Sequence, residues 1–385
     1  MKTTKVLISL PQQLIYGGVQ NYVFNLISHM DLTDLEIDVF FSQNIVSSDL
    51  AEKFRQHKIN LIVGNNIGNN KKINIKNISA LMKKNHYDVI HVNTGDLSYT
   101  AINMWLAKKY GIKKRIAHSH NAVVSKYKKL KILHLLKNKL DRKIINNRVT
   151  NRFACSKVAG YWLFGKTIFE KKGTVQNNGL DPEKFHFNQE DRKNFREKLG
   201  IPQNSQVLGL TAYFNAQKNH SYLIKIFAEY LKLNPKAILL LIGDGELKDK
   251  IIQQISQLKI TDNVIIAPSS AEGHKYYSVM DFFVMPSIYE GLPFVGIEAQ
   301  LNGLPVLFSD AITKDVSFNE NTYFLSNLLE PKIWADKIFS LIKEYPIERR
   351  LSSFEITKNN LEKKGYNVKI CAEKIRQVYL KNISN

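Results

Sequence analysis

The chain contains 385 residues, of which 44% are hydrophobic and 10% aromatic. This length exceeds one ordinary hydrophobic core and predicts two globular domains. No apolar stretch reaches the roughly 18 residues of a membrane-spanning helix. The apolar run Lys5–Leu10 is too short for a signal peptide, and Pro11 ends it. Cys155 and Cys371 lie far apart, which argues against a disulfide framework or a cysteine-built metal site, so we expect a cytoplasmic protein.

Lysine and arginine total 55 against 34 aspartate and glutamate residues, a formal net charge of +21. An excess of this sign favours nucleic acid, an anionic membrane or phosphorylated substrates as partners. The sequence has neither a zinc-finger spacing nor an RNP-type aromatic strand, so we expect no nucleic-acid partner. The abundance of Lys, Asn and Ile is also typical of an AT-rich genome, and part of the charge then carries no function.

Short apolar runs alternate with amphipathic stretches along most of the chain, which predicts βα units around parallel sheets. The expected strands are Val6–Leu10, Ile37–Phe41, Val89–Val92, Arg115–His118, Arg152–Cys155, Val207–Leu210, Ala237–Ile242, Asn263–Ile266, Phe282–Met285 and Val306–Phe308. Helical patterns lie between them, for example at Val19–Met30 and Ser221–Leu233. The polar, turn-rich run Asp181–Ser205 predicts the connection between the domains, with the boundary near Phe185.

Two candidate sites follow strands of the first half, where ligands of such sheets gather. Gly17 and Gly18 open the helix after the first strand and either admit a ligand or make a tight turn. They do not belong to a Gly-x-Gly-x-x-Gly pattern, so a nicotinamide cofactor is weakly supported. His118 and His120 share one face of their strand. No carboxylate or cysteine stands at a usual spacing, so we expect no metal there; a histidine bonded to backbone is the alternative to a functional one.

A basic amphipathic stretch runs from Lys126 to Arg152. It contains ten lysines and arginines and one acid, Asp141, interleaved with leucine and isoleucine. Such a stretch is suited to an anionic lipid surface, with the long cationic side chains reaching the headgroups. We therefore expect residues 126–152 to bind the inner face of the plasma membrane. Polyanion binding and an ordinary solvated helix face are the alternatives.

The most informative segment is the run Pro286–Gln300, which carries two carboxylates, Glu290 and Glu298, eight residues apart. A strand, a turn with glycine and proline and a helix expected from about Phe294 follow one another here. The free N–H groups and positive dipole end of such a helix form an anion site. Carboxylates on either side suit vicinal hydroxyl groups, such as those of a sugar and a ribose flanking a diphosphate. A surface helix with two solvated glutamates is the alternative.

This segment resembles the Glu-x7-Glu signature of the retaining glycosyltransferases of family 4, also called group 1. The resemblance continues through Leu304–Leu307 and Ser309-Asp310 and covers nearly the whole chain. It implies an α/β GT-B fold, with two Rossmann-like domains facing an inter-domain cleft. The acceptor domain would span 1–184 and the nucleotide-sugar domain 185–365, with a C-terminal helix in 366–385 packing back on the first. We expect a metal-independent transfer of sugar from a nucleotide-sugar with retention at the anomeric carbon. The expected donor is a UDP-sugar.

The resemblance also implies roles for individual residues. His120 and Glu290 would be catalytic, with His118 as the second candidate for the histidine. Glu290 would bind donor-sugar hydroxyls, Glu298 the ribose and Lys218 the diphosphate. The remaining donor-site candidates are Gly17, Gly18, Gly291, Leu292, Pro293 and Phe294, with Asn215 and Tyr213 as second-tier candidates. The basic stretch suggests a lipid-linked or oligosaccharide acceptor in capsule or exopolysaccharide assembly.

One position departs from the family pattern. The arginine expected five residues before Lys218 is Tyr213, and a phenol does not replace a permanent cation beside a leaving group that gains charge. Either another residue compensates, the donor sits differently, or catalysis is weak. The alternative function is therefore an inactive glycosyltransferase-like partner or chaperone of an active homologue. A nucleotide-sugar epimerase of similar fold and a basic nucleic-acid binder are further alternatives, and Gly243–Glu246 reads as a structural turn rather than a metal motif.

Overall fold

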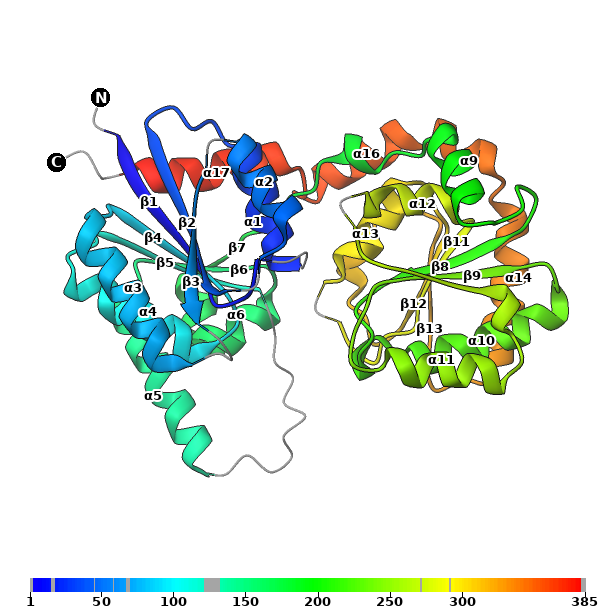
Figure 1. The fold of residues 1–385 in the computed structure, drawn as a ribbon, viewed down its shortest axis with the longest axis horizontal. Helices are drawn as coiled ribbons and strands as arrows, with labels where there is room; N and C mark the ends of the chain where they lie inside the picture. The colour runs from blue at the N-terminus through cyan, green and yellow to red at the C-terminus, as the bar shows by residue number, and fades with distance from the viewer. Residues whose placement is uncertain are drawn as a thin grey trace. The chain divides into compact units, whose positions relative to one another are not determined.

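The computed structural model describes residues 3–14, 18–44, 46–57, 59–66, 70–120, 132–270, 272–290 and 292–381. The chain forms two compact units: unit 1 comprises Met1–Gly179 and Gly365–Asn385, and unit 2 comprises Leu180–Lys364. Each unit is a parallel sheet covered by helices (Figure 1). None of the helices in the described ranges is both long and apolar enough to cross a membrane.

Unit 1 contains a seven-stranded parallel sheet in the order β3-β2-β1-β4-β5-β6-β7. Its strands are β1 (Thr4–Leu10), β2 (Leu35–Gln43), β3 (Asn60–Asn66), β4 (Val89–Asn93), β5 (Lys114–Ser119), β6 (Asn151–Ala154) and β7 (Gly173–Val175). The strand order reverses between β1 and β4, which is the point where open α/β sheets bind ligands. The described residues at the carboxyl ends of β1, β4 and β5 therefore mark the candidate site of this unit.

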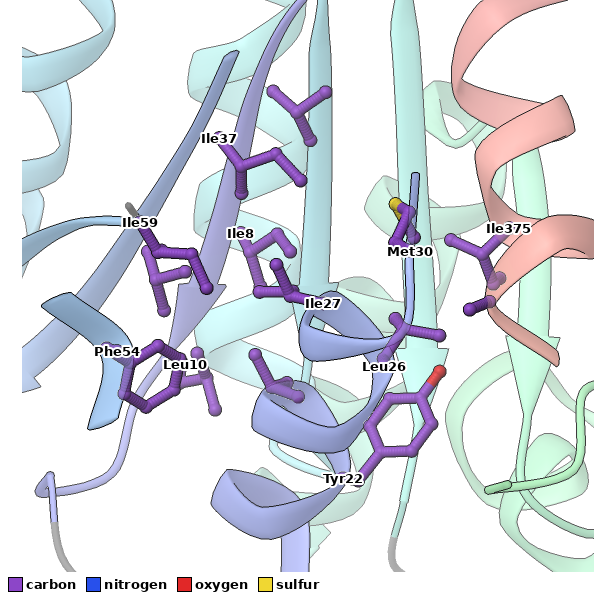
Figure 2. Close-up of a cluster of buried hydrophobic side chains, with 14 of the residues drawn as sticks. Ile8, Leu10, Tyr22, Leu26, Ile27, Met30, Ile37, Phe54, Ile59 and Ile375 are labelled. Atoms are coloured by element: carbon purple, nitrogen blue, oxygen red, sulfur yellow. The ribbon is translucent and has the colours of Figure 1, made fainter. Parts of the chain in front are cut away.

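Eight helices of the described residues complete unit 1. They are α1 (Gly18–Ser28), α2 (Ser48–Gln56), α3 (Lys71–Asn85), α4 (Leu97–Lys109), α5 (Ile132–Arg148), α6 (Lys157–Phe164), α7 (Lys166–Lys172) and α17 (Val368–Leu380). Short polar side chains at the N-caps bind free backbone N–H groups; for example, Asp96 accepts from Tyr99 N at the start of α4. The final helix, α17, packs against α1 and β1, and its Ile375 lies in the same apolar cluster as Ile8 and Leu26 (Figure 2).

Unit 2 contains a six-stranded parallel sheet in the order β10-β9-β8-β11-β12-β13. Its strands are β8 (Val207–Thr211), β9 (Ile238–Ile242), β10 (Val264–Ala267), β11 (Phe282–Met285), β12 (Val306–Ser309) and β13 (Thr322–Leu325). Its α-helices are α8 (Pro182–Phe185), α9 (Gln189–Lys198), α10 (His220–Leu233), α11 (Lys248–Gln257), α12 (Tyr276–Val279), α13 (Phe294–Leu301), α14 (Pro331–Glu344), α15 (Ile347–Ser352) and α16 (Phe354–Lys363). The 3₁₀-helix η1 (Ala216–Lys218) precedes α10.

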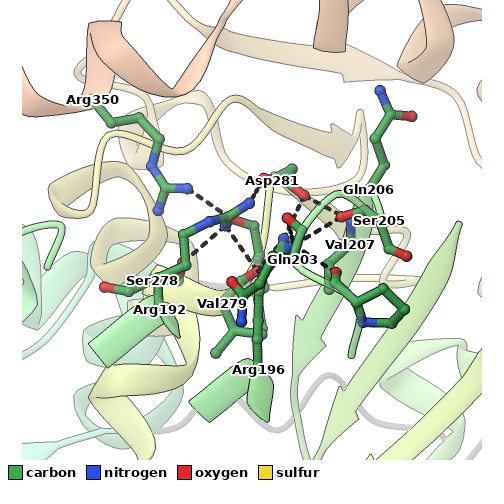
Figure 3. Close-up of polar contacts among 12 residues, drawn as sticks. Arg192, Arg196, Gln203, Ser205, Gln206, Val207, Ser278, Val279, Asp281 and Arg350 are labelled. Carbon is green, nitrogen blue, oxygen red and sulfur yellow. Dashed lines mark hydrogen bonds and ion pairs between the residues drawn. The ribbon is translucent and has the colours of Figure 1, made fainter. Parts of the chain in front are cut away.

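The prediction that Asp181–Ser205 connects the domains is wrong. This run forms α8 and α9, which belong to unit 2. Arg192 and Arg196 of α9 pair with the two carboxylate oxygens of Asp281 at 2.6 and 2.8 Å, and the Arg196 side chain is fully buried. Arg350 joins the same region by donating to backbone carbonyls (Figure 3). Two of the charges that suggested a connecting segment therefore belong to an ion-pair network with Asp281, and such pairing lets charged groups tolerate burial.

Candidate functional site

The loop between β11 and α13 is held in place by the segment that follows β8. Gln217 accepts a backbone hydrogen bond from Ile288 at 2.8 Å, and its side chain donates to Tyr289 O at 3.1 Å. Asn219 donates to Pro286 O at 3.1 Å. Asn219 itself has a left-handed backbone conformation, with φ of 56°, which asparagine tolerates better than most residues. These bonds fix the loop that carries Glu290 against the loop that carries Lys218.

The same loop is also fixed from the neighbouring strand. Ser309, at the end of β12, donates to Ser287 O at 2.5 Å, and Asn327 donates to that carbonyl at 3.2 Å. Glu290 forms an isolated parallel bridge with Ile312. The backbone position of Glu290 is therefore set by tertiary contacts on both sides, as a preorganised binding group requires.

Lys218 and Glu290 form the central ion pair of this site. Lys218 Nζ lies 2.7 Å from Glu290 Oε1, and the two side chains are only 18% and 8% exposed. Asn215 caps η1 by accepting from Lys218 N at 3.1 Å, which fixes the backbone of the lysine. Two residues that are 72 positions apart are thus brought into a charge-assisted contact with little solvent screening.

Glu298 lies in the second turn of α13. Tyr277, which is fully buried on α12, donates to Glu298 Oε2 at 2.6 Å. Burial raises the pKa of Glu298 above its usual value, while the Tyr277 hydrogen bond opposes that shift. Tyr277 was missed in the sequence because nothing in the local pattern indicates that its hydroxyl group reaches α13.

The N-terminus of α13 is open among the described residues. Pro293 occupies the N-cap position, and no side chain provides a cap hydrogen bond there. Phe294 is the first helical residue and Leu292 precedes the cap. The first N–H groups of this eight-residue helix can therefore donate to an anion. Gly291 lies outside the described residues.

Tyr213 lies in the segment between β8 and η1. Its side chain is 57% exposed. Partial burial raises the pKa of Tyr213, and the negative charge and hydrogen bond of Glu246 raise it further. The turn that carries Glu246 packs on the backbone of Phe214, which donates to Asp244 O at 2.8 Å. A Cβ at Gly245 would come within 2.6 Å of Phe214 O. Residues 211–219 contain one lysine, Lys218, and no arginine, so this segment brings a single cation to this side of the sheet.

In unit 1 the two predicted histidines extend from the end of β5. The rings of His118 and His120 lie 4.2 Å apart, and the ring of His91, on β4, stacks on His118 at 5.4 Å. His91 Nδ1 lies 2.7 Å from the hydroxyl group of Tyr379 on α17, and Nε2 lies 3.3 Å from His118 Nδ1. Burial lowers the pKa of His91 and of His120 to about 3, and it also lowers that of His118. All three are therefore neutral near pH 7.

Two further predictions concern this unit. Gly18 is the first residue of α1, and no atom lies within 4 Å of a Cβ built there, so local space does not require glycine at that position. Gly17 lies outside the described residues. The described ranges contain no group of three or more His, Cys, Asp or Glu side chains that could hold a metal ion. The rings of His118 and His120 both pack against the ring of Tyr22.

Comparison with known proteins places this geometry in a family. The model described as glycosyl transferases group 1 matches residues 191–357, and the model described as Glycosyltransferase Family 4 matches residues 16–184. The putative glycosyltransferase EpsF of Bacillus subtilis (strain 168) is 29% identical over 327 residues, which cover 84% of each chain. The UDP-Gal:alpha-D-GlcNAc-diphosphoundecaprenol alpha-1,3-galactosyltransferase of Escherichia coli is 25% identical over 324 residues, 79% of this chain and 78% of that one.

A solved structure shares the fold over nearly the whole chain. Anabaena Alr3699/HepE, in complex with UDP-glucose, has a TM-score of 0.76 at 18% identity and covers 97% of this chain and 98% of that one. The two family models fall one on each half of the sequence and together account for most of it. The chain therefore has the GT-B fold and belongs to the group 1 glycosyltransferases of family 4, which transfer a sugar from a nucleotide-sugar.

Proposed function

We propose that this protein is a retaining glycosyltransferase that moves a sugar from a UDP-sugar to a hydroxyl group of a lipid-linked glycan during surface polysaccharide assembly of the capsule or exopolysaccharide type. The observation that carries the proposal is the buried Lys218–Glu290 pair, held at 2.7 Å beside the open N-terminus of α13. A cation and free N–H groups suit a diphosphate. Glu290 and Glu298 then offer carboxylates for the donor sugar and the ribose.

The proposed reaction needs no dedicated protein base. The bond between the anomeric carbon and the diphosphate oxygen breaks, and the acceptor oxygen bonds to that carbon on the same face. The acceptor proton passes to a phosphate oxygen of the departing UDP, so charge and atoms balance. Lys218 and the N–H groups of α13 stabilise the negative charge that develops on the diphosphate, which is the role a metal ion would otherwise take.

The proposed lipid acceptor rests on the surface of α5. Leu135, Leu136 and Leu140 are 54%, 59% and 57% exposed and alternate with lysines. The one acid, Asp141, is buried and pairs with Lys137 at 2.7 Å, so it does not oppose an anionic surface. The Escherichia coli relative is named for an acceptor attached to diphosphoundecaprenol. A helix of this kind lies at a membrane interface with its leucines among the acyl chains. Residues 126–131 of the basic stretch lie outside the described residues.

The donor site is tested by thermal stabilisation with UDP, GDP, ADP and their sugar conjugates. We expect stabilisation by UDP and one UDP-sugar, and its loss in Glu298→Gln. Glu355→Gln, an exposed carboxylate on α16, is the matched control and should leave the shift unchanged. Stabilisation by no nucleotide would contradict the donor assignment, and stabilisation by GDP or ADP alone would contradict the uridine base.

The membrane assignment is tested by flotation with vesicles of phosphatidylglycerol and phosphatidylcholine. We expect binding that weakens with salt and is lost in Leu136→Glu with Leu140→Glu. Leu351→Glu with Ile356→Glu, at residues of unit 2 that are 57% and 65% exposed, adds the same two charges elsewhere and should bind normally. Equal flotation of both variants would exclude α5 as the contact.

A catalytically inactive partner is the second candidate, and Tyr213 is the observation that favours it. Tyr213→Arg supplies the cation that the site lacks and removes the contact with Glu246. If the protein is a weakened enzyme, turnover should rise in this variant. If it is an inactive partner, UDP-sugar turnover should be absent in both proteins.

A further inference from the structure

Asn93, the last residue of β4, contacts a backbone carbonyl through its amide nitrogen and a histidine ring through its amide oxygen. Its Nδ2 donates to the backbone carbonyl of His91 at 3.3 Å, and its Oδ1 lies 2.9 Å from His120 Nε2. The carbonyl can only accept, so it selects the orientation in which the Asn93 amide nitrogen faces it. Oδ1 then faces His120, and because Oδ1 has no hydrogen, the second bond requires a hydrogen on Nε2.

The other nitrogen of His120 is consequently an unprotonated acceptor. Burial lowers the pKa of His120 to about 3, so near neutral pH the ring carries one hydrogen, which the Asn93 contact places on Nε2. Nδ1 is buried and has no hydrogen-bond partner among the described residues. The ring of His120 lies beside those of His118 and Tyr22, with centroid separations of 4.2 and 4.7 Å. A buried acceptor without a partner is unusual in a folded protein and marks a group kept ready for a ligand.

The backbone of His120 is fixed as well as its ring. Cys155 Sγ donates to His120 O at 3.4 Å, and the Asn93 backbone pairs with His118 in the parallel register of β4 and β5. Residues at the ends of β4 and β6, the two strands that flank β5, therefore hold the ring nitrogen and the main chain of this histidine. Such support from a second residue is how a binding group retains one orientation.

We propose that Asn93 is a positioning residue that holds His120 as the Nε2–H tautomer, so that Nδ1 accepts a hydrogen bond from a sugar hydroxyl group at the reacting centre. The identity of the ligand rests on the proposed function, whereas the tautomer does not. His120 is thereby assigned as an acceptor toward the substrate and not as a proton donor. The hydroxyl group belongs either to the donor sugar or to the acceptor.

The tautomer is tested without any measurement of activity. In protein labelled with ¹⁵N-histidine, long-range ¹H–¹⁵N spectra distinguish a protonated from an unprotonated ring nitrogen, and His120→Gln identifies the His120 signals by their loss. We expect Nε2–H in the wild type and a changed pattern in Asn93→Leu, which has no acceptor. A wild-type Nδ1–H ring, or signals unaffected by Asn93→Leu, would overturn the proposal.

Asn93→Asp gives a second test in a variant of nearly the same shape. The carboxylate still accepts from Nε2 but also stabilises the imidazolium form, so the pKa of His120 rises. Protonated Nδ1 cannot accept, and kcat/KM should then fall at least about tenfold on the acid side of a new pH limb. A pH profile like that of the wild type would contradict the positioning role, and the ¹⁵N spectra of folded Asn93→Asp report the same protonation independently.

Substitutions of His120 itself distinguish the contributions of its two ring nitrogens to catalysis. The amide of His120→Asn lies near the Nδ1 position, and that of His120→Gln lies near the Nε2 position. We expect His120→Asn to lose about tenfold in kcat/KM and His120→Gln about a hundredfold or more; the opposite order would overturn the proposal. A raised KM for the donor assigns the hydroxyl group to the donor sugar, and a raised KM for the acceptor assigns it to the acceptor. If the wild type shows no turnover, the proposed function fails while the ¹⁵N spectra still decide the tautomer.

Discussion

At the scale of single residues, the candidate donor site of unit 2 gives each of its buried charged groups a specific partner. Lys218 is paired with Glu290, and Glu298 is bonded to Tyr277. A donor diphosphate would therefore enter a site whose carboxylates are already oriented, so little side-chain ordering remains to oppose binding. The two pairs lead to different predictions. The Lys218–Glu290 pair contributes a positive charge to the site, whereas the Tyr277 hydrogen bond orients the Glu298 carboxylate.

Replacing Lys218 by methionine should weaken both binding and catalysis. The variant removes the cation that we propose binds the diphosphate and leaves Glu290 as a buried negative charge without its partner. We expect kcat/KM to fall about a hundredfold or more, the range found on removing one stabilising group from developing charge, and UDP affinity to fall as well. Calorimetric titration with UDP measures the second effect. Lys218→Arg retains the charge and is the control; a loss of equal size in both variants would show that shape, not charge, is decisive.

Replacing Tyr277 by phenylalanine should affect binding alone. The variant removes the hydrogen bond to Glu298 Oε2, which opposes the upward shift of the Glu298 pKa. A lost hydrogen bond to a carboxylate corresponds to about tenfold in nucleotide Kd. We expect kcat at saturating donor to remain unchanged. Tyr276→Phe alters the neighbouring buried tyrosine and should leave the Kd unchanged, and a similar loss in that variant would indicate a packing effect.

At the scale of helices and strands, the sequence predicts central strands far better than edge strands. The strands it misses are β3, β7 and β13, and each lies at an edge of its sheet. An edge strand is covered less on its faces, so its residues do not form a continuous apolar run. The Thr322–Leu325 residues of β13 are all only partly buried, whereas every residue of the predicted β9 is buried.

The same limit applies to the candidate site. Glu290, Glu298 and Lys218 are marked by the motifs around them, and the structure brings Lys218 to Glu290 without any local signal of the pairing. Tyr277 and Asn93 carry no motif, because their importance depends on a partner on another element. The buried arginines of α9 look like solvated charges until Asp281 is placed beside them. Pairing between distant residues is a property of the tertiary fold that composition does not contain.

Helix α17 completes the core of unit 1, which leads to a prediction about stability. Ile375 is 0% exposed within the cluster of Figure 2, whereas Ile370 of the same helix is 43% exposed. Ile375→Ala should therefore lower the free energy of unfolding of unit 1 by about 2–5 kcal/mol. Ile370→Ala removes the same atoms from the exposed face and should cost less than about 1 kcal/mol. Chemical denaturation followed by circular dichroism measures both, and equal effects would mean that α17 is not part of the cooperative core.

At the scale of the whole molecule, the two units each have their own sheet and apolar core, but unit 1 is closed by the last helix of the chain. Polar contacts also connect this helix to the sheet: the hydroxyl group of Tyr379 contacts His91, and His91 contacts His118. Neutral imidazoles buried at the centre of a core make folding depend on pH. This cluster therefore links the stability of unit 1 to protonation.

The direction of that dependence follows from the pKa values. His91 and His120 have pKa values of about 3 in the folded chain, against about 6.5 when unfolded. Between these values the unfolded chain binds protons that the folded chain excludes. Their contribution to stability is therefore complete above about pH 6.5 and is lost as the pH falls toward the folded values. Each such histidine should lower the free energy of unfolding by about 1.4 kcal/mol per pH unit in this window.

Removing one histidine should reduce this slope. We expect the free energy of unfolding of unit 1, measured by denaturant titration at pH values from 7 to 5, to fall less steeply in His91→Gln by about 1.4 kcal/mol per pH unit. The absolute stability of this variant will also change because Tyr379 loses its partner, so the slope and not the intercept is the test. His134→Gln removes an exposed histidine of α5 and should leave the slope as it is. An unchanged slope in His91→Gln would mean that His91 is already protonated in the folded protein or is reached by water, and that the buried cluster does not set the acid sensitivity of unit 1.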